Sequence, residues 1–149
     1  MLTRLPLVLA AAAILAAAPL AAPVPAGGAG TRPTVAVARS DYGPILFDGR
    51  GFALYAFTRD PARRSVCSGA CAKAWPPYLA RGQMKAGAGT KASLLATTRP
   101  PDGTRQVTYA GRPLYYYVGD RSPGQVLCQN VREFGGLWLV VRGSGRLVR

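Results

Sequence analysis

The feature of this chain that most constrains its fold is a seven-residue phrase that occurs twice, sixty residues apart. Both copies follow the pattern Leu-Tyr-x-aromatic-x-x-Asp, first over residues 54–60 and then over residues 114–120. The same shift superimposes further identical pairs, including Arg39 with Arg99 and Gly51 with Gly111. A repeat of fixed period indicates an architecture built from similar units. We therefore expect a single domain over residues 34–149, built from repeats at about 34–92 and 93–149.

Each repeat has the signals of a β-meander, in which short β-branched or aromatic runs alternate with turns rich in glycine and proline. The runs expected to form strands are 34–38, 45–47 and 52–57 in the first repeat, 93–98, 106–109 and 113–118 in the second, and a closing strand over 137–141. The sixty-residue shift pairs Phe47 with Val107. The fold class expected is mainly β, a small pseudo-twofold β-meander repeat domain of sandwich or barrel-like form, with one or two short helices. One such helix is expected from Gly69 to Trp75, capped by Ser68 and stopped by Pro76.

The repeated phrase itself is explained by packing. Residues two apart on a strand point to the same face, so each phrase presents a pair of aromatic rings on one side and its leucine on the other. The aspartates that end the phrases are expected to cap the turns that follow. The alternative is a functional one, in which the rings and carboxylates line a cleft between the repeats. The residues of that possible cleft are Tyr55, Phe57, Asp60, Tyr115, Tyr117 and Asp120.

The sequence contains few of the residue types that catalysis usually requires. The sequence contains no histidine and only six acidic residues, which removes the usual general base, metal ligand and axial haem ligand. No nucleophile elbow, phosphate loop or dinucleotide fingerprint is present. We therefore expect a protein that is not an enzyme, with no catalytic residues and no cofactor.

Cys67 and Cys71 form the one reactive constellation. Their spacing of four fits one helical turn, and a slight unwinding at Gly69 lets a disulfide close. We favour a structural disulfide in an oxidising compartment over a redox-active pair, whose thiol pKa basic neighbours would lower. A third interpretation is a Cu(I) site formed by Cys67, Cys71 and either Met84 or Cys128. Cys128 makes the cysteine count odd, and we expect it to be free rather than bridged to Cys67, Cys71 or another chain.

The first 26 residues have the pattern of a signal peptide: a basic start, an apolar run rich in alanine and leucine, and small residues before the expected cleavage at Gly27. An uncleaved membrane anchor is the alternative. Residues 27–33 are expected to be a flexible N-terminal segment. No cysteine lies near the signal, so we expect an exported protein, periplasmic or extracellular, that is not anchored by lipid.

The formal net charge is +13, and sixteen of the nineteen basic residues are arginine. For an exported protein we expect no nucleic-acid partner; an anionic membrane surface or cell-envelope polymer fits the charge better, and simple solubility is the alternative explanation. The leading hypothesis is an exported, extracytoplasmic, non-enzymatic binding or envelope-associated domain of unknown ligand. The alternative is a thiol-redox or Cu(I)-handling accessory protein that uses the Cys67/Cys71 pair. The sequence indicates no oligomeric state.

These motifs together resemble a known family. They are Leu54-Tyr55-x-Phe57-x-x-Asp60, Cys67-x-Gly69-x-Cys71-Ala72-x-x-Trp75-Pro76-Pro77, Arg99-x-x-Asp102-Gly103-x-x-Gln106-Val107-Thr108-Tyr109, and Gly111-x-Pro113-Leu114-Tyr115 through Asp120 to Pro123-Gly124. The combination resembles the bacterial "secreted repeat of unknown function" family, predicted lipoproteins with a Tyr-x-aromatic-x-x-Asp motif, over roughly residues 35–142. The resemblance implies an extracytoplasmic, β-rich domain built from repeats, and no established activity. The chain departs from the family pattern by lacking a lipobox and in the loop over residues 125–136.

Overall fold

Three small antiparallel sheets make up the structure, a computed structural model that describes residue 32, residues 34–100 and residues 102–149. All of these residues belong to one unit of the chain. The expected signal peptide, and the expected flexible segment apart from Arg32, lie outside the described residues. Among the described residues, no helix is both long enough and apolar enough to cross a bilayer.

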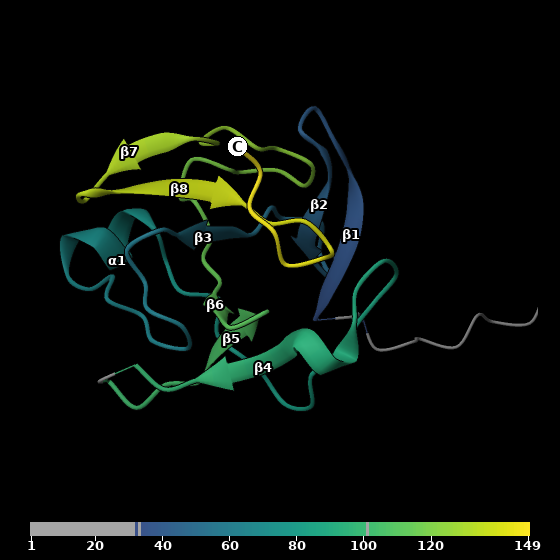
Figure 1. The fold of residues 1–149 in the computed structure, drawn as a ribbon, viewed down its shortest axis with the longest axis horizontal. Coiled ribbons are helices and arrows are strands. Elements are labelled where there is room, and N and C mark those ends of the chain that lie inside the picture. The colour runs from purple at the N-terminus through teal and green to yellow at the C-terminus, as the bar shows by residue number, and fades with distance from the viewer. Residues whose placement is uncertain (1–31, 33, 101) are drawn as a thin grey trace, which may run out of the picture. The chain divides into compact units, whose positions relative to one another are not determined.

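The sheets are assembled mainly from hairpins (Figure 1). The first sheet pairs β1 with β2, the second has the order β3-β8-β7, and the third has the order β4-β5-β6. The strands are β1 Val35–Ser40, β2 Gly43–Asp48, β3 Tyr55–Phe57, β4 Leu95–Thr98, β5 Gln106–Tyr109, β6 Arg112–Pro113, β7 Val131–Glu133 and β8 Gly136–Val140. The helices are α1 Ala70–Ala74 and the 3₁₀ turn η1 Ala92–Leu94. The mainly β fold class predicted from the two meanders is confirmed, as separate small sheets rather than one closed sheet.

Several element boundaries differ from the sequence prediction. The strand expected over 113–118 is reduced to β6 and an isolated bridge at Tyr115. The strand β7 was not predicted; it pairs with β8 through a tight turn in which Phe134 and Gly135 both have positive φ. The cap expected from Ser68 is wrong, because no side-chain hydrogen bond caps α1 and the chain enters this helix through Gly69 at φ 56°.

A pseudo-twofold relation between the repeats is visible in the backbone hydrogen bonds. Tyr55 and Tyr115 exchange both of their amide-to-carbonyl bonds, at 3.0 and 2.9 Å, so the two phrases meet at their tyrosines. Around this point the bonds come in matched pairs, for example Arg63 N–H to the Gly111 carbonyl and Gly124 N–H to the Gly51 carbonyl. The two repeats are therefore joined at their centres by reciprocal backbone hydrogen bonds.

At the turn that follows β2 and β5, the register of the repeat differs by one residue from the expected sixty. Leu54 N–H donates to the Leu46 carbonyl, and in the second repeat Leu114 N–H donates to the Val107 carbonyl. Leu46, not Phe47, is thus the counterpart of Val107. The reason is that the turn between β2 and β3 is one residue longer than its equivalent after β5. Gapless alignment could not reveal this insertion.

Two buried clusters form the core, on opposite sides of the repeated phrase. The tyrosine of each phrase lies in an aromatic cluster and the leucine in an aliphatic one, as the alternation along a strand predicts. The aromatic cluster contains Tyr55, Phe57, Trp75, Tyr115 and Trp138, and the aliphatic cluster contains Val35, Leu46, Leu54, Val107, Leu114 and Val141. Both clusters draw on both repeats, so neither repeat has a core of its own.

Candidate functional site

The centre of the aromatic cluster is a stack of four rings that crosses between the repeats. Trp75 and Trp138 lie face to face with centroids 4.0 Å apart, Phe57 stacks outside Trp138 at 4.3 Å, and Tyr117 lies outside Trp75 at 4.8 Å. The two tryptophans therefore separate Phe57 of the first phrase from Tyr117 of the second. The sequence places the tryptophans at comparable positions after each phrase, and the fold brings them together.

Two crossed hydrogen bonds connect the phrases. The Tyr55 hydroxyl donates to Asp120 at 2.7 Å, and the Tyr115 hydroxyl donates to Asp60 at 2.6 Å. The other carboxylate oxygen of each aspartate accepts a backbone N–H from its own following loop, at Val66 and Leu127. The turn-capping role predicted for both aspartates is thus combined with a link between the repeats.

Burial governs the protonation of these groups. It raises the pKa of both Asp60 and Asp120 above the ordinary range, against hydrogen bonds that lower it. It also raises the pKa of Tyr55 and Tyr115 far above that of a free tyrosine, and each bonded carboxylate adds to the rise. Both tyrosines are fully buried, and their hydroxyls are already bonded to the aspartates.

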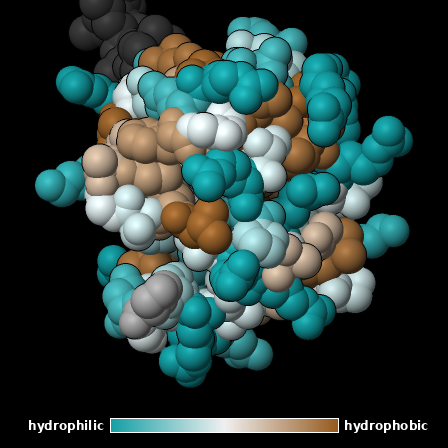
Figure 2. Space-filling model, turned by 60° about the vertical axis from the view of Figure 1, so that its left-hand side comes forward, coloured by the Kyte–Doolittle hydropathy of each residue, from teal (hydrophilic) through white to brown (hydrophobic). Residues whose placement is uncertain are grey.

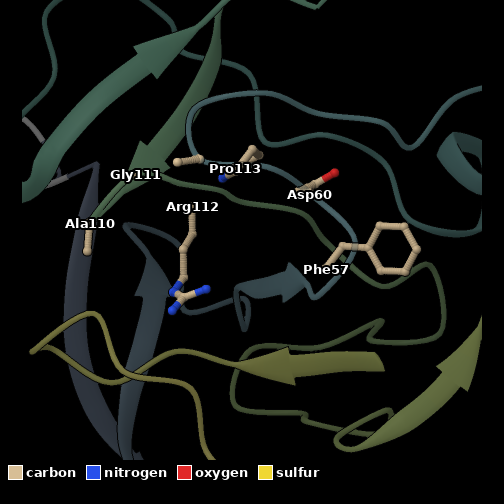
Figure 3. Close-up of a pocket in the computed structure, with 7 residues that line it drawn as sticks. Phe57, Asp60, Ala110, Gly111, Arg112 and Pro113 are labelled. Atoms are coloured by element: carbon tan, nitrogen blue, oxygen red, sulfur yellow. The ribbon is translucent and has the colours of Figure 1, made fainter. Parts of the chain in front are cut away.

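Phe57 and Asp60 lie beside a small pocket of about 170 Å³ (Figure 3). Its opposite side is the turn over residues 110–113, at the end of β5 and the start of β6. Arg112 contributes to this wall, and its side chain donates to the Gly145 carbonyl at 3.1 Å. Tyr115, Tyr117 and Asp120 do not line this pocket. The structure therefore joins four of the six residues as the pairs Tyr55–Asp120 and Tyr115–Asp60. The other two, Phe57 and Tyr117, lie at opposite ends of the ring stack.

The expected disulfide between Cys67 and Cys71 is present, with a Cα–Cα distance of 5.3 Å. Cys67 lies in the loop before α1 and not on the same helical turn, because the backbone reverses at Gly69. Cys128 is a buried free thiol in the aromatic cluster, and burial raises its pKa.

The residues considered for copper are not gathered at one place. Met84 packs against the aliphatic cluster, whereas Cys71 and Cys128 belong to the aromatic one and Cys67 packs against it. No group of three or more His, Cys, Asp or Glu side chains suited to a metal occurs in the part of the chain that the structure describes.

A larger pocket, of about 460 Å³, adjoins the disulfide and was not foreseen from the sequence. It is lined by the loop over 65–69 and by Ala72, Pro77, Pro100, Asp102 and Gln106. Gln106 is fully buried; its Nε2 donates to the Leu114 carbonyl at 2.9 Å, but its Oε1 has no partner among the described residues. Because a carbonyl faces the amide nitrogen, the orientation of this amide is fixed. The sequence gives one signal of this pocket: the polar Gln106 begins a short strand, all four residues of which are buried in the structure.

Comparison with protein families gives a match on both repeats. The model of the family described as "Secreted repeat of unknown function" matches residues 36–78 and 96–142. These two ranges correspond to the halves that the pseudo-twofold relates. No curated protein and no solved structure matches the chain.

Proposed function

Since this chain belongs to the family of secreted repeats of unknown function, we propose that it is an exported, non-enzymatic domain that binds anionic groups of the cell envelope through its arginine and lysine side chains. The anionic groups meant are those of lipid headgroups or of envelope polymers. The observation that carries this proposal is the separation of charge between surface and interior.

The basic side chains are at the surface and the acidic ones are mostly inside. Of the eighteen arginine and lysine residues in the described part of the chain, sixteen are exposed, whereas only Asp41 and Asp102 are exposed among the six acids. The space-filling view in Figure 2 has hydrophilic side chains projecting around much of the face, between smaller apolar patches. Surface cations therefore far outnumber the surface carboxylates that could neutralise them.

The remaining acids are engaged in internal hydrogen bonds. Asp60 and Asp120 accept from tyrosine hydroxyls, and Glu133 accepts from the Trp75 indole at 2.8 Å. Asp48 forms the single ion pair found among the described residues, with Arg50 at 2.9 Å, and also accepts from the Tyr116 hydroxyl. Burial by itself raises the pKa of Asp48, but the bonds from Phe52, Arg50 and Tyr116 outweigh it and hold this pKa low.

Apart from Arg50, the surface cations of the described residues therefore have no carboxylate partner and are available to external anions. Arginine is suited to such contacts, because its planar fork donates two hydrogen bonds to one phosphate or carboxylate and its charge persists at every physiological pH. The absence of histidine from the sequence, together with the internal engagement of four of the six acids, supports a role in binding rather than in catalysis.

The test is binding to vesicles of neutral lipid, to vesicles that contain anionic lipid, and to a soluble anionic envelope polymer, each at rising salt. We expect binding to the anionic targets only, weakening as salt screens the charges. The lipid and polymer arms identify the source of the anionic group. Salt-insensitive binding of equal strength to neutral vesicles would refute the proposal.

A matched pair of variants sharpens this test. Arg64, Arg81, Arg121 and Arg132 are exposed and their side chains form no hydrogen bond with described residues. Replacing all four by glutamine should weaken binding by up to about 1 kcal/mol for each side chain near the surface. Replacing the same four by lysine keeps the charge and should retain most of the affinity.

A further inference from the structure

The pseudo-twofold relates two short segments of extended chain, 77–79 in the first repeat and 140–142 in the second. Tyr78 accepts an N–H from Val107, and its counterpart Val141 accepts one from Leu46. One edge of each segment is thus hydrogen-bonded to a strand in the same way. The two segments differ in what pairs with their opposite edge.

In the second repeat this other edge is covered by the chain's own last residues. Val148 N–H donates to the Val140 carbonyl at 3.0 Å, and Arg142 N–H donates to the Arg146 carbonyl at 2.8 Å. The Val148 side chain is buried in the aromatic cluster, which also contains Ile45, Cys128 and Val140. The tail therefore adds a short antiparallel strand and inserts one aliphatic side chain.

In the first repeat no described segment covers the equivalent edge. The Pro77 carbonyl and the Leu79 N–H, which correspond to the groups that bind the tail, form no hydrogen bond with any described residue. The pocket of about 460 Å³ lies here. Its lining residues Pro77, Cys67 and Gln106 are the counterparts of Val140, Cys128 and Ile45, which belong to the same buried cluster as Val148.

One position in this comparison changes from apolar to polar. Ile45, the counterpart of Gln106, belongs to the cluster that holds Val148 and carries no polar group, so the fold does not require an amide at this position. Gln106 nevertheless has a fully buried Oε1 without a partner. A buried acceptor left unsatisfied destabilises the fold, and a ligand with a suitably placed donor would remove this cost.

We propose that the 77–79 edge and the adjoining pocket bind an extended segment of a partner polypeptide, as a strand added to the edge of the fold. The partner's backbone donates to the Pro77 carbonyl and accepts from the Leu79 N–H, as residues 148 and 146 do in the second repeat. One partner side chain enters the pocket beside Gln106 and donates a hydrogen bond to Oε1. Strand addition of this kind takes affinity from the backbone and specificity from such pockets. A threonine has the shape of the valine that fills the other half, together with the required donor.

The experiment uses the full mature chain and two capped hexapeptides. The first has the sequence of residues 144–149 with glutamine in place of both arginines, and the second also has threonine in place of its valine. Binding is measured by calorimetry at high salt, where adhesion to anions is suppressed, so failure here is separate from failure of the proposed function. We expect the threonine peptide to bind about tenfold more tightly than the valine peptide, and N-methylation at the threonine, which removes the donor to Pro77, to abolish binding.

The variant Gln106→Ile provides the control, since isoleucine is the residue that the equivalent site already holds. Its fold is checked by circular dichroism and thermal unfolding. We expect the preference for threonine to disappear in this variant, with the valine peptide then bound at least as well. The proposal is overturned if neither peptide binds the native chain, if the preference survives Gln106→Ile, or if N-methylation has no effect. Dimerisation of the chain that Val148→Asp abolishes would also overturn it, because the occupant would then be a second copy and not a separate partner.

Discussion

At the residue scale, the two repeats are held together by side chains that each serve both halves. Each aspartate of the repeated phrase closes the loop of its own repeat with one oxygen and accepts a tyrosine hydroxyl from the other repeat with the second. Both tyrosines also place their rings edge-on against a tryptophan, Tyr55 on Trp75 and Tyr115 on Trp138. The repeated phrase thus closes the following loop, packs its tyrosine ring against a tryptophan and holds the two repeats together.

Removing one hydroxyl tests this link. We expect Tyr55→Phe to lower the free energy of unfolding by about 1–3 kcal/mol, because the ring stays packed while a buried carboxylate loses its donor. The measurement is urea unfolding followed by tryptophan fluorescence. Tyr42→Phe is the matched control: this tyrosine is 38% exposed, and its replacement should leave stability unchanged. An equal effect of the two substitutions would contradict the role given to the Tyr55–Asp120 bond.

At the element scale, the Cys67–Cys71 disulfide stabilises the entry to α1, a helix of only five residues without a side-chain cap. A loop this short gains about 2 kcal/mol from cross-linking in the chain-entropy view. We expect Cys67→Ser/Cys71→Ser to lose about that much stability while the fold is retained, and reduction of the native chain to have a similar effect.

The same disulfide separates the two functional hypotheses drawn from the sequence. A structural bridge should have a reduction potential below about −300 mV, whereas a redox-active pair should fall in the range of thiol oxidoreductases, about −270 to −120 mV. The potential is measured by equilibration with dithiothreitol and glutathione buffers. A value in the higher range would favour the thiol-redox alternative over a purely structural bridge.

The sequence predicts those strands that have a local pattern of their own, and misses those that form only because a distant partner strand is present. The hairpin of β1 and β2 and the strand β5 follow from β-branched and apolar runs between turn residues, and their positions were predicted closely. The strand β7 has the sequence Val-Arg-Glu, which carries no strand pattern; it forms because β8 provides an edge for pairing. The strand expected over 113–118 is short, because its partners beyond Pro113 are single residues from distant segments, such as Pro77 opposite Tyr115.

The candidate sites divide in the same way. The Cys67–Cys71 bridge and the tyrosine–aspartate phrase are visible in the sequence as spacings. The structure adds that each tyrosine bonds to the aspartate of the other repeat. The pocket at Gln106 could not be predicted. Its meaning depends on the one-residue insertion that makes Ile45 its counterpart and on the path of the C-terminal strand, both of which are three-dimensional facts.

At the scale of the whole molecule, the structure uses neutral tyrosines as internal donors and arginines as the surface charge. Burial raises the pKa of Tyr78 to about 12, and it raises the pKa values of Tyr55, Tyr115 and Tyr116 further. In the unfolded chain these side chains ionise near pH 10. The folded state therefore keeps protons that the unfolded state releases as the pH rises past that value.

This difference predicts that stability is lost in alkali. Since these pKa values are raised on folding, their contribution is fully present below about pH 10 and declines as the pH rises toward the folded values. For the fully buried Tyr55 and Tyr115 the decline approaches about 1.4 kcal/mol per pH unit each. Relief of charge repulsion cannot offset this loss of stability, because only three of the basic residues are lysines and the arginines stay charged.

Urea unfolding at pH 8, 9, 10 and 11 should show a free energy of unfolding that is constant at first and then falls. The double variant Tyr55→Phe/Tyr115→Phe should be less stable at pH 8 and fall less steeply above pH 10, whereas a slope equal to that of the native chain would mean that these two hydroxyls do not govern the response.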